Sequence, residues 1–136
     1  MNVNPFVVHR DDAQPFTTKD GSTIREILAS RVAPGVIRNQ SLAEATLLPG
    51  SVTQAHYHPV SEEIYYVLSG TGMMFTGDPE TPTKPWNSQM VTKGNAVAIA
   101  PGVPHQISNT GSDDLVFLCC CAPEYTHEDT IFVDKP

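Results

Sequence analysis

The segment GSVTQAHYHPVSEEIYYVLSG, residues 50–70 of this 136-residue chain, governs the interpretation of the whole sequence. It contains His56 and His58, followed by a run of strand-forming residues at positions 64–68. Side chains two positions apart point the same way on an extended chain, because successive side chains of a strand alternate between its two faces. The pattern therefore predicts two imidazoles side by side on the inward face of a strand.

Further candidate ligands lie close by in the sequence. A carboxylate follows the histidine pair at Glu62 or Glu63, and a second segment, GNAVAIAPGVPHQISN at residues 94–109, supplies His105 after a Pro-Gly turn. Three imidazoles and one carboxylate suit a borderline divalent metal such as manganese, iron, nickel, zinc or copper. The spacing of the residues alone leaves the choice between the two glutamates open.

The two segments resemble the two sequence motifs of the cupin family. The first cupin motif has the pattern G-x5-H-x-H-x3-4-E-x6-G, and every position of it is filled here. The matching residues are Gly50, His56, His58, Glu63 and Gly70. In this frame the six-residue gap before Gly70 selects Glu63 over Glu62 as the ligand.

The second cupin motif has the pattern G-x5-P-x-G-x2-H-x3-N. It is matched by Gly94, Gly102, His105 and Asn109. Ala100 stands where the family has proline, and Pro101 follows one place later. That departure affects a turn residue and none of the ligands. Together the two motifs and the segment between them span residues 50–109.

The resemblance implies both a fold and a ligand set. Cupins are all-β proteins whose double-stranded β-helix, or jelly roll, holds a metal inside the barrel. Carried onto this sequence, the implied ligands of one divalent transition metal (Mn, Fe, Ni, Zn or Cu) are His56, His58, Glu63 and His105. The sequence itself also predicts short strands separated by turns, which is typical of a sandwich or barrel.

The size and composition of the chain favour a single domain. It has 12 prolines and 9 glycines and few long helical patterns, which indicates short strands and turns. We expect one cupin domain over residues 1–136, with an N-terminal arm at 1–22, a barrel core at 40–122 and a C-terminal tail at 123–136. Residues 23–30 fit either a helical face or a strand, and the cupin resemblance favours a strand.

Charge and hydropathy narrow the class of partner. The formal net charge of −7 argues against nucleic acid or an anionic membrane surface as a partner. There is neither a signal-peptide pattern nor an apolar run long enough to span a bilayer, so we expect a cytoplasmic protein. The expected partners are a small-molecule substrate and a second copy of the chain, because a lone cupin domain leaves apolar strands exposed.

Tyr65 is the candidate catalytic residue. It has the same strand parity as Glu63, so its ring is expected to line the barrel near the metal, where the hydroxyl could donate to a substrate. The alternative is a core tyrosine bonded to backbone. In the consecutive cysteines Cys119 to Cys121, the first and last face one way, and we expect buried thiols, with a thiol near the metal as the alternative.

The cupin resemblance implies three classes of function. The first is a metal-dependent enzyme, an oxidoreductase of the dioxygenase type, acting on a small oxygenated substrate. The second is a non-redox isomerase or lyase in which the metal is a Lewis acid and Tyr65 transfers a proton. The third is a non-catalytic protein that binds a metal and a small ligand. One fold hosts many chemistries, so the motifs leave these three open.

Overall fold

The structure, a computed structural model, describes residues 6–136, and the regular secondary structure of this part of the chain consists of short strands and one 3-10 turn. A single 3-10 turn, η1, spans Arg10–Asp12. The strands are β1 (Phe16–Thr17), β2 (Thr23–Leu28), β3 (Ser41–Leu47), β4 (His56–Tyr57), β5 (Glu62–Ser69), β6 (Thr71–Thr76), β7 (Asn87–Thr92), β8 (Ala96–Ile99), β9 (His105–Asn109), β10 (Leu115–Ala122) and β11 (Ile131–Phe132).

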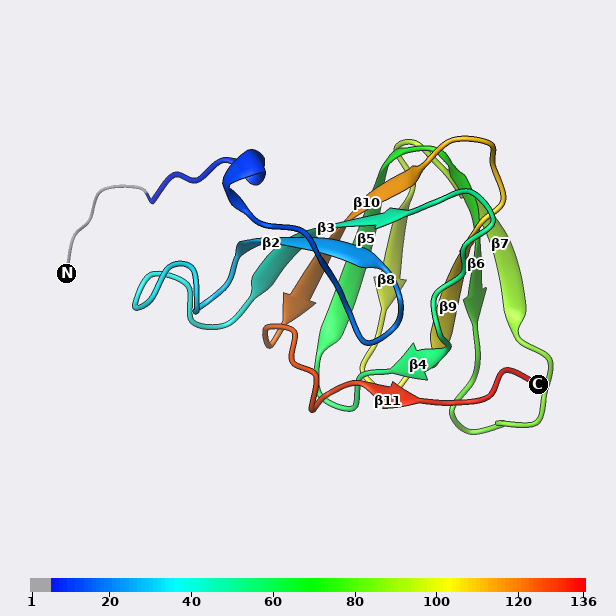
Figure 1. The fold of residues 1–136 in the computed structure, drawn as a ribbon. Coiled ribbons are helices and arrows are strands. Elements are labelled where there is room, and N and C mark those ends of the chain that lie inside the picture. Colours follow the sequence, from blue (N-terminus) through cyan, green and yellow to red (C-terminus); the bar gives the residue numbers. More distant parts are fainter. Residues whose placement is uncertain (1–5) are drawn as a thin grey trace.

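Two antiparallel sheets face each other and form the barrel (Figure 1). One sheet has the strand order β1-β2-β3-β10-β5-β8, and the other has the order β11-β4-β9-β6-β7. This arrangement confirms the all-β, double-stranded β-helix predicted from the sequence. The strand expected within residues 23–30 is also confirmed, since β2 pairs along β3. The described residues include no helix long and apolar enough to cross a membrane.

Strand β5 shows why this sequence forms a barrel wall. Its exposure alternates from Glu62 to Leu68, so that Glu63, Tyr65 and Val67 are buried and the residues between them are exposed. The chain then leaves β5 for β6 in the other sheet through Gly70, which has φ +90°. A Cβ atom at Gly70 would lie 2.5 Å from the carbonyl oxygen of Asp114, so only glycine fits this turn.

The core lies between the two sheets and is made by inward side chains of both. Val67, Leu115 and Phe117 come from the first sheet and Ile107 from the second, and each is at most 1% exposed. Burying one such side chain contributes about 1.5–3 kcal/mol to folding. The core continues into the polar site, because Phe117 and Tyr65 belong to the core cluster and also line the cavity beside His56.

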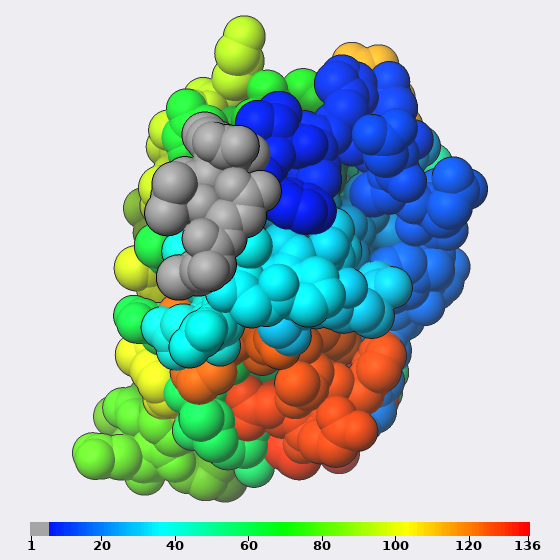
Figure 2. All heavy atoms as spheres, turned by 90° about the vertical axis from the view of Figure 1, so that its left-hand side faces the viewer, coloured from blue at the N-terminus to red at the C-terminus, as the bar shows by residue number. Residues whose placement is uncertain are grey.

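The N-terminal segment is attached to the first sheet. β1 pairs with β2, and the Arg10 guanidinium donates two hydrogen bonds to the Glu44 carboxylate of β3, at 2.7 and 2.9 Å. The tail joins the other sheet, because β11 pairs with β4. Figure 2 shows the N-terminal segment in blue, the loop after β2 in cyan and the tail in orange and red gathered on one face.

Candidate metal centre

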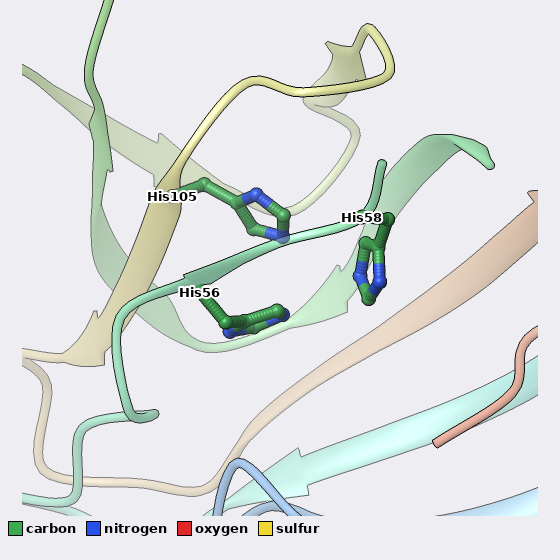
Figure 3. Close-up of side chains that lie close together, drawn as sticks. All are labelled: His56, His58 and His105. Atoms are coloured by element: carbon green, nitrogen blue, oxygen red, sulfur yellow. The ribbon is translucent and has the colours of Figure 1, made fainter. Parts of the chain in front are cut away.

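Three buried histidines lie together where strands β4 and β9 meet (Figure 3). His56 and His105 are direct partners in the pairing of β4 with β9, and His58 follows two positions after His56 along the chain. One ring nitrogen of each histidine lies within 4.8 Å of those of the other two. The structure therefore brings together the three imidazoles that the motifs predicted, from segments almost fifty residues apart.

Each imidazole is oriented by a backbone carbonyl that contacts its Nδ1 atom. The contacts join His56 to Gln54 (2.7 Å), His58 to Asp129 (2.9 Å) and His105 to Val103 (2.9 Å). A carbonyl oxygen only accepts hydrogen bonds, so Nδ1 carries the proton in each ring. Nε2 is then the ring nitrogen that can bind a metal, once any proton on it is lost.

Glu63 approaches the histidines from β5, in the opposite sheet. Its Oε1 atom lies 3.3 Å from Nε2 of His58 and 3.3 Å from Nε2 of His105. These three atoms are buried and have no hydrogen-bond partner among the described residues. Buried polar atoms are nearly always satisfied, and one divalent cation would satisfy all three. Glu62, the other candidate carboxylate, is exposed on the outer face of the strand.

Two groups of this cluster are held in the form that binds a cation, Glu63 as the carboxylate and His56 as the neutral ring. Burial would raise the pKa of Glu63, but the contacts with His105 and then His58 hold it well below its usual range. Burial and the neighbouring His105 charge lower the pKa of His56 to about 4, so this ring is neutral at physiological pH. Burial opposes protonation of His58, yet the contact with Glu63 raises its pKa.

The Cys121 thiol is hydrogen-bonded to the second carboxylate oxygen of Glu63. The two residues are cross-strand partners in the pairing of β10 with β5, and the Cys121 thiol donates to Glu63 Oε2 at 3.3 Å. Burial and the Glu63 charge raise the pKa of this thiol, so it stays protonated and can donate. Of the three thiols that were expected to be buried, Cys121 is buried, whereas Cys119 and Cys120 are half-buried. Cys121 also contacts a predicted metal ligand.

A cavity of about 50 Å³ opens beside the histidines and is lined by Tyr65, Phe117 and Cys119 among others. A single water needs about 10–15 Å³ on this measure, so a small organic molecule fits. Tyr65 is 3% exposed and its ring packs 4.7 Å from that of Phe117. Burial raises the pKa of Tyr65 well above its ordinary value, so its hydroxyl keeps the proton.

Reasoning from the sequence missed several polar residues of this cavity, among them Asp20 and Tyr125. Asp20 Oδ2 lies 3.9 Å from His56 Nε2, and the Tyr125 ring lies edge-on to His58 at 6.0 Å. An Asp-Gly pair at positions 20 and 21 signals only a turn. Both residues belong to segments outside the two motifs, and no local pattern reveals which wall of the barrel such segments cover.

Comparison with known proteins agrees with the fold and the motifs. Residues 43–121 match the Cupin domain family. An uncharacterized protein of Methanocaldococcus jannaschii is 45% identical over 120 residues, which cover 88% of each chain. The oxalate-binding protein of Thermotoga maritima is 36% identical over 76 residues, and the match spans 56% of each chain.

A solved structure supports the same assignment at the level of the fold. The oxalate decarboxylase of Lactobacillus farciminis, in a formate complex, superposes with a TM-score of 0.77 at 23% identity. The superposition covers 97% of this chain and 37% of the decarboxylase. The matched residues contain all four predicted ligands: His56 lies in β4, His58 directly follows that strand, Glu63 lies in β5 and His105 lies in β9. This chain therefore belongs to the cupin domain family.

Proposed function

We propose that this chain is a metal-dependent cupin enzyme that binds a small oxygenated organic molecule at one divalent transition metal. The ligands are His56, His58, Glu63 and His105. The observation that carries the proposal is the convergence of Glu63 Oε1 with the Nε2 atoms of His58 and His105, all buried without hydrogen-bond partners among the described residues. The carbonyl contacts at all three Nδ1 atoms support the same donor set.

In this proposal the metal and the residues around the cavity have separate roles in binding the substrate. When bound, a divalent metal with four protein ligands supplies Lewis acidity and open positions for oxygen-bearing molecules. Phe117 and neighbouring apolar side chains line much of the cavity beside the histidines. Tyr65 keeps its proton because burial raises its pKa, and in this proposal its hydroxyl donates a hydrogen bond to the bound substrate.

Oxygen chemistry of the dioxygenase type is the first candidate reaction. The mainly apolar cavity suits it, and Tyr65, with its raised pKa, is a poor general base for isomerisation. A non-redox isomerase or lyase is the second candidate, supported by the Asp20 carboxylate 3.9 Å from His56 Nε2. A non-catalytic role is the third, supported by the match with a relative that is named for binding a small molecule rather than for a reaction.

Metal analysis followed by oxygen uptake tests the proposal. Purified protein is expected to hold about one divalent metal ion per chain, and His58→Ala should lose most of it. Glu62→Ala is the control, because this carboxylate is exposed on the outer face of β5. Oxygen consumption with small hydroxy or keto compounds supports the dioxygenase. Turnover without oxygen uptake supports the second candidate, and absence of metal after reconstitution refutes the metal centre.

A homodimer and a cytoplasmic location are part of the same proposal. The outer face of β5 exposes Ile64, Tyr66 and Leu68, at 49, 44 and 36% of their areas, and a second copy of the chain could cover this row. All three cysteines are unbridged, as is usual in a reducing compartment. Light scattering at several concentrations checks the dimer, and Tyr66→Glu is expected to convert it to a monomer.

A further inference from the structure

The cavity beside the proposed metal centre has an uneven distribution of charge. Three carboxylates line it, from Asp20, Glu26 and Glu63, and the described residues around it include no lysine or arginine. Glu63 is a proposed ligand. Glu26 is paired with the Arg31 guanidinium at 2.9 Å. The Asp20 carboxylate is therefore the acidic group of the cavity that neither a protein cation nor the proposed metal neutralises directly.

Asp20 is held firmly in the turn between β1 and β2. Its Oδ1 atom accepts hydrogen bonds from the Thr18 hydroxyl (2.7 Å), the Ser22 amide (3.0 Å) and the Ser22 hydroxyl (2.7 Å). Its backbone carbonyl accepts from the Gln54 amide at 2.8 Å, which ties the turn to the segment leading into β4. The other oxygen, Oδ2, lies 3.9 Å from His56 Nε2 and faces the cavity.

The basic side chains nearest to Asp20 in the sequence point elsewhere. Lys19 donates to the carbonyl oxygen of Thr130 at 3.1 Å and lies over the ring of Phe132. Arg25 donates to the carbonyl oxygen of Ala13 at 2.7 Å. A second negative charge brought into the cavity would therefore meet the Asp20 carboxylate with only the metal to offset it, and like charges at close range repel strongly where water is excluded.

We propose that Asp20 sets the substrate class of this site: it disfavours dicarboxylates, oxalate included, and favours a small uncharged molecule. Such a molecule offers a carbonyl or hydroxyl oxygen to the metal and an O–H or N–H group to Asp20 Oδ2. A hydrogen bond to a carboxylate is stronger than one between neutral groups, and the apolar walls at Phe16, Ile24 and Phe117 suit an uncharged body. The inference rests on the proposed metal centre.

The test compares two small chelators on manganese-loaded protein. Oxalate is the dianion, and glycolamide is uncharged at neutral pH and offers a carbonyl and a hydroxyl oxygen with N–H and O–H donors. Asp20→Asn keeps the Oδ1 acceptor of the turn and replaces only the oxygen facing the cavity. By calorimetric titration we expect Asp20→Asn to raise the affinity for oxalate at least about tenfold and to lower that for glycolamide about tenfold.

Asp78→Asn is the matched control, because Asp78 also accepts a local backbone hydrogen bond, from Glu80 at 2.9 Å, but does not line this cavity. It should leave the ratio of the two affinities unchanged. Metal content is measured on every sample. A metal-loaded wild type whose affinity ratio equals that of Asp20→Asn overturns the inference alone. Loss of manganese in Asp20→Asn makes Asp20 a ligand and also overturns it, whereas a wild type without metal refutes the proposed function itself.

Discussion

Replacing Cys121 by alanine should weaken metal binding, although this residue is no proposed ligand. The thiol donates to Glu63 Oε2 at 3.3 Å and so leaves Oε1 directed at His58 and His105. Alanine removes the donor and leaves room for the carboxylate to rotate. Cys121 is 2% exposed and Glu63 is 5% exposed, so bulk water is poorly placed to take over the lost hydrogen bond.

The size of the effect follows from the burial of this pair. Leaving a buried acceptor without its donor costs about 1–3 kcal/mol, and a tenfold change in affinity corresponds to about 1.4 kcal/mol. Residues that orient a metal ligand typically contribute about 10–100-fold in affinity, which agrees with that range. We therefore expect Cys121→Ala to bind manganese or zinc about 10–100-fold more weakly than the wild type.

Competition with a chromogenic chelator measures the affinity, with two further variants alongside. Cys121→Ser keeps a donor and should recover most of the affinity. Cys120→Ala deletes the same atoms on the opposite face of β10 and should bind metal as the wild type does. If Cys121→Ala retains wild-type affinity, the thiol does not orient Glu63 and the reasoning is wrong. Equal losses in both alanine variants would indicate a general loss of structure.

Three other outcomes are expected. In a melting assay, Glu63→Gln should abolish the stabilisation that added metal gives, and Glu62→Gln should keep it. For the wild type this stabilisation is about 2.7 kcal/mol when the metal concentration is a hundred times the dissociation constant. In metal-free protein the unfolding free energy should fall by up to about 3 kcal/mol between pH 6.5 and 4. Burial lowers the pKa of His56 in the folded state to about 4, so between these pH values His56 is protonated in the unfolded chain and neutral in the folded one. His56→Gln should make the free energy of unfolding, measured with urea, depend less on pH. Phe117→Ala should cost about 3–5 kcal/mol, because its side chain is 1% exposed, and a loss below 1 kcal/mol by urea titration would contradict this packing.

Much of the site could be predicted because strand alternation is a local property. Glu63 and Tyr65 are buried and Glu62 is exposed, as the parity of β5 requires, and the spacing of the motif glycines selected the same glutamate. The barrel fold followed from the same two motifs. The substrate-binding role of Tyr65 and the identity of the metal stay predictions, since burial and parity place a side chain without stating its chemistry.

What the sequence alone determined is which residue types face inward along each strand, because the backbone alternates every two residues. Only the tertiary structure decided which distant groups meet them. The Asp129 carbonyl reaches His58 from 71 positions along the chain, and Cys121 meets Glu63 across 58 positions. Asp20 lies beside His56 for the same reason. Strand register and loop placement depend on the packing of the whole barrel, so no local pattern encodes these contacts.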